Sequence, residues 1–346
     1  MTLDVLRKAE VMITRSCNLR CHYCRTIYPF QPQLKELSIE KWKKAFRILA
    51  NQKVFASIIG GEPTSLGDGL VELVRYFAEI KLRYAITSNC TLLTEKYAER
   101  LLEVGLDGWT ASIDAVAGSV GTADAHSHLK SQRGYQWLKW FQERGVRDLV
   151  ANMVITRKNI HLIPDMVRNL SDEGFWVITS PLNIGKHGVD EFSSVRYRFS
   201  SDSKFVGDLE WKDKDEVRKY TKILADMARS GKYRMHNVPE MYADFMPRFF
   251  RSRDWYCDEP SSICIDADGT LMCCVEWNIF DPVTKKATYS VFDLTDPVKR
   301  EEIYQAFKYS NRKCSGCVWD SHFQTEELRK HPEEEWRYRH SVPKGA

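Results

Sequence analysis

The segment Glu10-Val-Met-Ile-Thr14, followed after two residues by Cys17-Asn-Leu-Arg-Cys21-His-Tyr-Cys24, is the part of the chain that most constrains its fold. The first run is apolar and β-branched, which predicts a buried strand. The second places three cysteines at positions i, i+4 and i+7 of one short loop. Thiolates at this spacing can wrap one cubane iron–sulfur cluster and leave one iron without a protein ligand. Structural zinc normally takes four ligands in two spaced pairs, and His22 is poorly placed to be the fourth.

Five more strand-like runs follow, separated by segments with apolar residues at helical spacing. Strands are predicted at 10–14, 54–59, 83–87, 108–113, 149–155 and 175–179. Helices are predicted around 42–49, 70–77, 97–102, 135–141, 164–170 and 216–228. Ser38 and Thr94 are the expected N-caps, and Gly145 and Gly174 the expected helix stops. Repeated strand–helix units predict an α/β fold with a parallel sheet, as a barrel, a partial barrel or an open sheet, and functional groups at the C-terminal strand ends.

The composition narrows the class of protein. A chain of 346 residues, 43% hydrophobic, can bury a large core, which excludes disorder and a small disulfide scaffold. The net charge of +4 is too small to indicate a partner. The N-terminus lacks the apolar core of a signal peptide and no uncharged run is long enough to span a membrane, so we expect a cytoplasmic protein without a membrane partner. In that reducing compartment, ten cysteines indicate metal binding or catalysis.

Motifs at four successive strand ends resemble those of the radical SAM superfamily. The cysteine loop resembles its signature, in which the open iron holds the amino and carboxylate groups of S-adenosylmethionine. Gly60-Gly61-Glu62-Pro63 follows the second strand, Ser88-Asn89-Cys90 the third and Ser112-Ile-Asp114 the fourth. Glycine pairs are also common turn punctuation. Four matches in the right order, each on its own strand, nevertheless support the resemblance over about residues 8–180.

The resemblance implies roles for these residues. The glycines would let the backbone approach S-adenosylmethionine, and Glu62 would receive its ammonium group. Ser112 and Asp114 would face the cofactor, and the backbone of Tyr23 would look toward the adenine. The implied cofactor-binding residues are Tyr23, Gly60, Gly61, Glu62, Pro63, Ser88, Asn89, Ser112, Asp114 and Asn152.

Cys90 departs from the family pattern, because it stands where a glycine is expected. One interpretation is a small buried residue, since a free cysteine packs as a hydrophobe. The other is a thiol that donates a hydrogen atom to a product radical. Without the glycine, Asn89 is expected to need a strained backbone.

The C-terminal cysteines resemble an auxiliary cluster module called SPASM, in its shortened form, Twitch. The resemblance implies one auxiliary [4Fe–4S] cluster held by Cys257, Cys274, Cys314 and Cys317. A hairpin turning at Asp268-Gly269 would bring the first two together. A four-thiolate zinc site is the alternative. Cys273 could replace Cys274, because adjacent strand residues face opposite sides, and Cys264 is expected to pack or to donate hydrogen.

The expected fold is therefore a partial (β/α)6 TIM-like barrel followed by a small α+β Twitch-type domain. Residues 1–182 would form the radical SAM barrel, 183–254 a connecting loop and helical segment, and 255–346 the auxiliary domain.

The implied chemistry is homolytic. An electron donor such as flavodoxin or ferredoxin would reduce the first cluster, which would split S-adenosylmethionine into methionine and a 5′-deoxyadenosyl radical. That radical would abstract a hydrogen atom from a substrate carbon, leading to oxidation, epimerisation or rearrangement. If Cys90, Cys264 or Cys273 donates hydrogen, a redox-neutral step is expected. If all three only pack, oxidation through the auxiliary cluster is expected.

The substrate stays open between a peptide, an aminosugar and a nucleotide or nucleic acid. Only sixteen residues precede Cys17, which weakens a leader-guided peptide, and nothing suggests the carboxylate-rich pocket of an aminosugar enzyme. The stretch Arg248-Phe-Phe-Arg251-Ser-Arg253-Asp-Trp-Tyr interleaves cations with aromatic rings, as in sites that bind phosphates and stack bases. The alternative is an amphipathic segment with snorkelling arginines. A nucleic-acid-binding protein with structural metal is the non-enzyme alternative.

Overall fold

The computed structural model describes residues 3–21, 24, 35–114, 125–156, 158–182, 214–251, 255–257, 259–275, 277–314 and 320–331. Tyr23, Cys317, His22 and the predicted connecting loop over 183–210 lie outside the described residues. Within the described part of the chain, no helix is long and apolar enough to cross a membrane.

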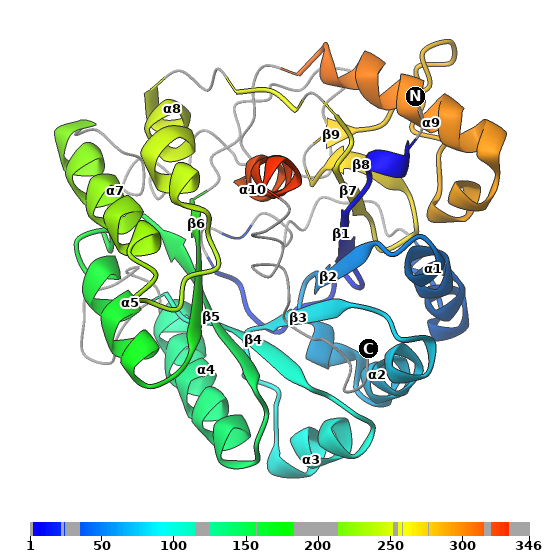
Figure 1. The fold of residues 1–346 in the computed structure, drawn as a ribbon. Coiled ribbons are helices and arrows are strands. Elements are labelled where there is room, and N and C mark those ends of the chain that lie inside the picture. Colours follow the sequence, from blue (N-terminus) through cyan, green and yellow to red (C-terminus); the bar gives the residue numbers. More distant parts are fainter. Residues whose placement is uncertain are drawn as a thin grey trace.

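One sheet of nine strands organises the described chain, in the order β6-β5-β4-β3-β2-β1-β7-β8-β9 (Figure 1). The six predicted strands are confirmed and run parallel: β1 (Lys8–Met12), β2 (Phe55–Ile59), β3 (Tyr84–Ser88), β4 (Gly108–Ser112), β5 (Asp148–Ile155) and β6 (Trp176–Pro181). The C-terminal part adds β7 (Ser262–Ile265), β8 (Leu271–Cys274) and β9 (Trp277–Asn278).

Five helices alternate with the parallel strands and cover the outer face of the sheet (Figure 1). They are α1 (Ile39–Asn51), α2 (Asp68–Ile80), α3 (Glu95–Glu103), α4 (Ala125–Glu143) and α5 (Ile163–Asp172). The hydroxyls of Ser38 and Thr94 accept from backbone N–H groups in the first turns of α1 and α3, so both predicted N-caps are confirmed. Gly145 and Gly174 follow α4 and α5 with φ of +78° and +91°, the conformation expected of helix stops.

Four more helices and four short helical turns complete the described chain. The helices are α7 (Lys214–Arg229), α8 (Met246–Arg251), α9 (Pro297–Asn311) and α10 (Asp320–Lys330). The turns are η1 (Leu3–Val5), η2 (Pro63–Leu66), the π-helical η3 (Met241–Phe245) and η4 (Val291–Thr295).

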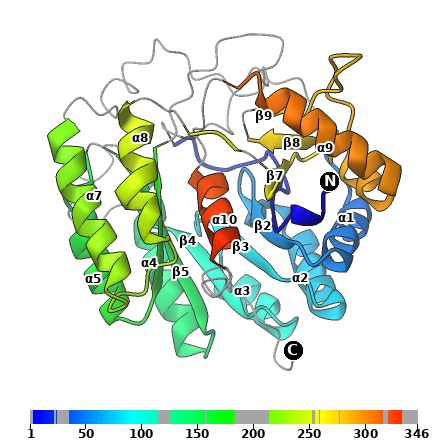
Figure 2. The same ribbon diagram turned by 45° about the horizontal axis from the view of Figure 1, so that its top comes forward.

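The two faces of the sheet differ in chemistry. Alternate strand residues such as Val11, Ile58 and Ile86 are fully buried against the outer helices. The register places the opposite set on one shared inner face, running from Glu10 through Ser57 to Ala85. From Thr87 the same face continues through Thr110 and Val150 to Trp176. The sheet curves, and helix α10 lies within the curve (Figures 1 and 2).

Helix α10 bridges two distant strands of the sheet. Ser321 accepts from Lys8 Nζ of β1 at 2.6 Å, and Asp320 accepts from Ser180 Oγ of β6 at 2.9 Å. On another side, Phe323 packs against Phe245. The helix therefore occupies the inner face between the first and the last of the six parallel strands.

The C-terminal segment joins the same sheet. Strand β7 pairs in parallel with β1, with Lys8 opposite Ser262 and Val11 opposite Ile265. Strand β8 then returns antiparallel after a turn in which Gly269 has φ of +89°, which confirms the predicted hairpin. The boundary predicted near residue 255 is thus crossed by continuous strand pairing.

Candidate functional site

The cysteine loop that follows β1 is fixed to the end of β2 by backbone hydrogen bonds. Ile13 N donates to Ile59 O at 3.0 Å, Gly61 N to Thr14 O at 2.7 Å and Glu62 N to Ser16 O at 2.7 Å. The backbone entering Cys17 therefore runs directly alongside the Gly60-Gly61-Glu62 turn.

Glycine is required in this turn by the cysteine loop itself. A Cβ atom on Gly61 would lie 2.0 Å from Ser16 O, and one on Gly60 would lie 2.5 Å from Thr14 O. Both distances are far below van der Waals contact with backbone atoms, which cannot move aside cheaply. The sequence interpretation assigned the close approach to S-adenosylmethionine, whereas the contact within the protein already demands these glycines.

The Glu62 carboxylate is 1% exposed and is held by four donors. Its Oε1 accepts from Thr64 N at 3.0 Å, Thr64 Oγ1 at 2.6 Å and Ser88 Oγ at 2.7 Å. Among the described residues, Asn89 N is the donor to its Oε2, at 2.7 Å. Among the residues that the structure describes, no lysine or arginine pairs with Glu62. The donors offset part of the cost of burying a carboxylate and leave Oε2 able to accept from a further donor.

Asn89 connects the third strand end to the first cysteine. Its Nδ2 lies 3.7 Å from Cys17 Sγ and 3.2 Å from Asn18 Oδ1, and Leu19 N lies 3.4 Å from the same sulfur. Burial raises the pKa of Cys17, the Leu19 N–H lowers it, and the nearby Cys24 and Glu62 raise it again. The two N–H donors are directed at the sulfur, where they would stabilise the thiolate that ligates iron.

A buried ion pair beside the loop is a feature that the sequence interpretation missed. Lys130 Nζ lies 2.6 Å from Asp114 Oδ2, and Val154 N donates to Oδ1 at 2.9 Å. Burial lowers the pKa of Lys130, but Asp114, then Cys21 and Cys24, raise it above the ordinary value of a lysine. Asp114 is thus neutralised from within the protein, and Lys130 brings a buried positive charge close to the cysteine loop.

Ser112 and Asn152 are neighbours in the pairing of β4 with β5 and lie on the inner face. Both are partly exposed, and no described residue makes a hydrogen bond to either side chain. Pro63, by contrast, is buried as the first residue of η2. The structure therefore groups Gly60, Gly61, Glu62, Ser88 and Asn89 around Cys17, and leaves Ser112 and Asn152 available on the inner face.

Cys90 packs in the outer core. Its sulfur accepts from Trp109 Nε1 at 3.4 Å, and burial raises the pKa of the thiol to about 12. Its φ is +62°, while Asn89 is not in the left-handed region. The expected strain therefore falls on Cys90, at the position where the family has glycine, and the prediction of a strained Asn89 is wrong.

Three of the four predicted auxiliary ligands, Cys257, Cys274 and Cys314, lie among the described residues, and each is partly buried. Asn311 ties two of these segments together: its Nδ2 donates to Cys257 O, and its carbonyl accepts from Cys314 N at 3.0 Å. Cys317 lies outside the described residues.

The adjacent cysteines of β8 have different surroundings, as predicted. Cys273 is 5% exposed and its thiol lies 3.6 Å from Asn278 O. Burial raises the pKa of Cys273 and the nearby Cys274 and Cys314 raise it further. Cys274 is partly exposed and packs near Cys264, whose thiol lies 3.8 Å from Glu10 Oε2.

The donor set fits iron–sulfur clusters by its chemistry. Cys17, Cys21 and Cys24 are partly exposed cysteines of one loop, and none of them is in a disulfide. Within the described ranges, no three Cys, His, Asp or Glu side chains converge as a single metal ion would require.

In the stretch of arginines and aromatic residues that starts at Arg248, the side chains that the structure describes contact other parts of the protein. Arg248 lies 2.6 Å from Asp244 within the same helical segment, and Trp255 packs against Phe245 and Phe323. Arg253 lies outside the described residues.

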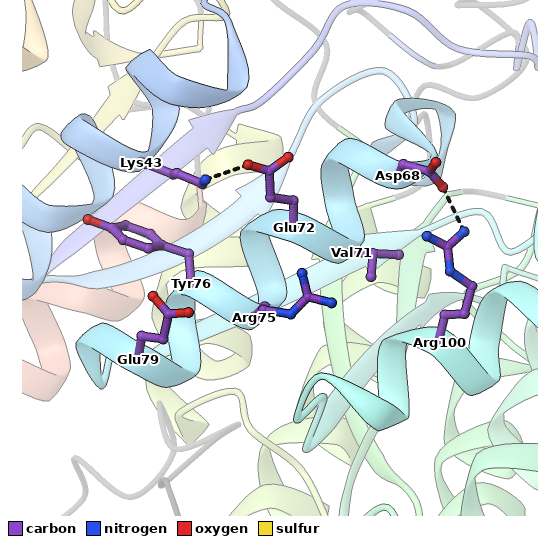
Figure 3. Close-up of a pocket in the computed structure, with 8 residues that line it drawn as sticks. All are labelled: Lys43, Asp68, Val71, Glu72, Arg75, Tyr76, Glu79 and Arg100. Carbon is purple, nitrogen blue, oxygen red and sulfur yellow. Dashed lines mark hydrogen bonds and ion pairs between the residues drawn. The ribbon is translucent and has the colours of Figure 1, made fainter.

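A pocket of about 350 Å³ lies on the outer helices α1, α2 and α3. Figure 3 shows the residues that line it. Its charged side chains neutralise one another, with Arg100 2.6 Å from Asp68 and Lys43 paired with Glu72. It lies on the helical side of the sheet, away from the inner face that carries Ser112 and Asn152.

Part of the chain is similar in sequence to a known protein family and to several proteins of known function. Residues 11–170 match the family model described as Radical SAM superfamily. The PqqA peptide cyclase of Bradyrhizobium diazoefficiens is 31% identical over 157 residues, covering 45% of this chain and 41% of the relative. An AdoMet-dependent heme synthase of Oleidesulfovibrio alaskensis is 30% identical over 167 residues, covering 45% and 40%. The match thus spans about two fifths of the length of these curated relatives.

Solved structures share the fold over more of the chain. Streptococcus suis SuiB bound to S-adenosylmethionine has a TM-score of 0.62 and 16% identity, covering 88% of this chain and 68% of SuiB. The anSMEcpe structure with bound AdoMet has a TM-score of 0.57 and 16% identity, covering 95% and 97%. The chain therefore has the α/β fold of these proteins, and its residues 11–170 are similar to the Radical SAM superfamily.

Proposed function

We propose that this chain is an enzyme that cleaves S-adenosylmethionine reductively and abstracts a hydrogen atom from a substrate carbon. When bound, a [4Fe–4S] cluster on Cys17, Cys21 and Cys24 and S-adenosylmethionine would supply the 5′-deoxyadenosyl radical. The observation that carries the proposal is the contact of Asn89 with Cys17 beside the buried Glu62. Three consecutive strand ends thereby place a cluster loop, a carboxylate and an amide in one site.

The surrounding residues suit the charges of S-adenosylmethionine. Glu62 Oε2 has one donor and can accept from an ammonium group. Lys130 offers a buried positive charge beside Cys21 and Cys24, where a carboxylate would be favoured. Ser112 and Asn152 lie on the inner face, and no described residue makes a hydrogen bond to their side chains, which suits further contacts. The chain's own part is to bind and orient the cofactor and substrate and to exclude water.

We further infer that the sheet is a partial (β/α)6 barrel and that the C-terminal segment is a Twitch-type module of the SPASM kind. Its auxiliary [4Fe–4S] cluster would be held by Cys257, Cys274, Cys314 and Cys317. The Asn311 contacts that join the first and third of these segments support this assignment. The whole chain would then have three parts: the barrel over residues 1–182, a connecting segment over 183–254 and the auxiliary module over 255–346. Strand β7 of the third part pairs with β1 of the first.

Oxidation is favoured over a redox-neutral step. The three remaining cysteines are each buried and hydrogen-bonded: Cys90 to Trp109, Cys264 to Glu10 and Cys273 to Asn278. Thiols held in this way are poorly placed to donate hydrogen to a product radical, and the auxiliary cluster would then accept the substrate's electron.

A peptide is the first substrate class to test, because a peptide cyclase is among the relatives. Aminosugars come next. A nucleotide is less favoured, because Arg248 and Trp255 are engaged by Asp244 and Phe245. A flavodoxin or ferredoxin is the proposed electron donor.

The test is anaerobic reconstitution with iron and sulfide, followed by dithionite reduction with S-adenosylmethionine. The wild type should form 5′-deoxyadenosine and methionine, and Cys17→Ala should form neither. Glu62→Gln should keep the iron but weaken binding of S-adenosylmethionine at least about tenfold, since it removes a charge-assisted hydrogen bond. Cys90→Gly is the matched cysteine control for iron content. A wild type that binds only zinc, or that leaves S-adenosylmethionine intact, would refute the proposal.

A further inference from the structure

The stretch that carries Cys17, Cys21 and Cys24 is anchored at its first end to the turn between β7 and β8. Arg15, two residues before Cys17, forms a two-pronged ion pair with Asp266 in this turn: Nε donates to Oδ1 at 2.9 Å, and Nη2 pairs with Oδ2. The Asp266 side chain is fully buried and the Arg15 side chain is 12% exposed. A guanidinium joined to a carboxylate at two points has a fixed orientation as well as a fixed contact.

The other end of this stretch reaches the same turn. Leu37 N donates to Ala267 O at 2.8 Å. The Leu37 side chain lies against Gly269, where a Cβ atom would be 3.1 Å from Leu37 Cδ1. Both ends of the stretch from Arg15 to Leu37, which contains the three cysteines, thus contact residues 266–269.

Glu36 joins the two ends of the stretch to each other. Its carboxylate accepts from Arg15 N at 2.7 Å and from Thr14 Oγ1 at 3.0 Å. Glu36 is exposed to water, which weakens its contacts, whereas Asp266 is 0% exposed. The pair of Arg15 with Asp266 is therefore the contact between stretch and turn whose loss leaves a buried charge uncompensated.

The same turn leads into a strand that ends at a proposed auxiliary ligand. Asp266 N donates to Thr270 O at 2.9 Å and Ile265 pairs with Leu271, so the turn is held by the start of β8. Strand β8 is four residues long and ends at Cys274. Metal binding to a cysteine also stabilises the fold of the segment that carries it. A cluster on Cys274 would therefore hold the turn, and with it Asp266, in place.

We propose that Arg15 and Asp266 couple the two cluster sites, so that a filled auxiliary site makes the cysteine loop hold its own cluster more tightly. Arg15 is the positioning residue, because its contact with Asp266 fixes the backbone that enters Cys17. This inference rests on the proposed function, from which it takes the ligands of both clusters. The expected effect is about tenfold, within the range of roughly 5- to 150-fold that is usual for coupled sites.

The first test compares four reconstituted chains: wild type, Arg15→Met, Cys274→Ala and the double variant. While an iron chelator removes the first cluster, its loss is followed by the electron paramagnetic resonance signal that Cys17→Ala lacks. Cys274→Ala should speed this loss about tenfold when Arg15 is present and leave it unchanged in the Arg15→Met chain. Equal acceleration in the two backgrounds, or none in the wild-type background, would overturn the proposal.

Arg100→Met is the matched control for the first test. Arg100 also pairs with an aspartate, Asp68, but this pair is exposed on the outer helices. The control chain should keep the full effect of Cys274→Ala. An effect abolished in Arg100→Met as well would show that any lost arginine has the same consequence, and the specific role of Arg15 would be excluded.

The second test measures hydrogen exchange in the same reconstituted chains. Arg15→Met should speed exchange of the Leu37 and Glu62 amides, which bond to the turn and to the cysteine loop, by at least about tenfold. The amides of β5 (Asp148–Ile155) should be unchanged. Arg15→Lys keeps the charge without the two-pronged contact, so it should lie between Arg15→Met and the wild type, and it carries the test if Arg15→Met unfolds. Full protection in both variants would contradict the proposal.

Cleavage of S-adenosylmethionine by the wild type is recorded in the same preparations. If cleavage is absent while both tests show the coupling, the proposed function has failed and the coupling stands. If cleavage is present but Cys274→Ala acts equally with and without Arg15, the coupling has failed and the proposed function stands.

Discussion

Single residues of the site are constrained by how closely two backbones approach. Gly61→Ala would place a methyl group 2.0 Å from Ser16 O, in the backbone that leads into Cys17. We expect this variant to lose roughly 3 kcal/mol or more of unfolding free energy, since neither backbone can yield without breaking the Glu62 N to Ser16 O bond. Urea denaturation measures the loss, and iron analysis should show that the cluster on the loop is depleted.

Gly145→Ala is the matched control. Gly145 also has a positive φ, of +78°, but no atom lies within 4 Å of the position of its Cβ. The Gly145→Ala substitution should lower the unfolding free energy by only about 1 kcal/mol, through backbone strain, and leave the iron content unchanged. Equal losses in the two alanine variants would mean that the close contact with Ser16 is unimportant.

The ion pair of Lys130 with Asp114 carries a second prediction at this scale. Lys130→Met leaves a buried carboxylate unpaired and should lower the unfolding free energy by about 3–5 kcal/mol. Adding Asp114→Asn should recover much of that loss, because the amide needs no counter-charge. The double variant should still bind S-adenosylmethionine weakly, since the positive charge near Cys21 is absent. Chemical denaturation measures the loss of unfolding free energy, and equilibrium binding to reconstituted protein measures the affinity for S-adenosylmethionine. If the losses of unfolding free energy from the two substitutions simply add in the double variant, Lys130 and Asp114 do not stabilise each other.

At the scale of elements, α10 introduces titratable groups beneath the site. His322 is 2% exposed, and burial lowers its pKa to about 4. The unfolded chain binds a proton below about pH 6.5, whereas the native imidazole does so only below about pH 4. The contribution of His322 to stability is therefore lost as the pH falls through this window, by up to about 3 kcal/mol.

His322→Gln should flatten this dependence when unfolding free energy is measured by denaturation from pH 7 to pH 4. Asp320 acts in the opposite direction, because its native pKa of about 6 lies above its unfolded value. Its native carboxyl takes up a proton first and gains stability as the pH falls through the same window. Unfolding free energy in the His322→Gln variant should consequently rise on mild acidification, and a wild-type slope retained in the variant would rule out His322 as the source.

At the scale of the whole molecule, one sheet joins the cysteine loop to the C-terminal cysteines. Arg15, two residues before Cys17, pairs with Asp266 of the β7–β8 turn, and β7 pairs with β1. The segments that carry the described cysteines of both sets are thus attached to one sheet.

Of the two adjacent cysteines in β8, we expect Cys274 and not Cys273 to be a ligand of the auxiliary cluster. Reconstituted wild type should hold about eight iron atoms per chain, as two cubane clusters. Cys274→Ala should lose about four of them, while Cys273→Ala should keep all, because the Cys273 thiol is directed at the Asn278 carbonyl. Iron analysis with electron paramagnetic resonance checks this, and Cys17→Ala provides the reference for loss of the other cluster. The opposite pattern would assign the ligand to Cys273.

The strands and much of the site were predictable because their signals are local. Alternation and helical spacing depend on neighbours a few residues away, so six strands and the caps at Ser38 and Thr94 were found within about two residues. Parallel strands end at one edge, so Glu62, Ser88 and Asn89 were expected near Cys17, and they contact one another there.

Other parts of the site carried no local signal. Lys130 is one lysine in an ordinary helical segment, and only folding places it against Asp114. Asp320 and His322 lie in a short helix whose sequence does not reveal that it enters the curve of the sheet. Cys90 takes the φ of +62° that glycine would adopt, because the Ser88 and Trp109 contacts hold it in place.

The order of the motifs along the chain was sufficient to indicate the α/β class, the cysteine loop at the first strand end and the radical chemistry that we propose. Only the tertiary structure decided that β7 extends the sheet beside β1, that α10 bridges β1 and β6, and that Lys130 neutralises Asp114. The physical reason is that spacing along the chain encodes which face a residue occupies. Burial, charge pairing and proton affinity depend instead on residues that are distant in sequence and meet only when the chain folds.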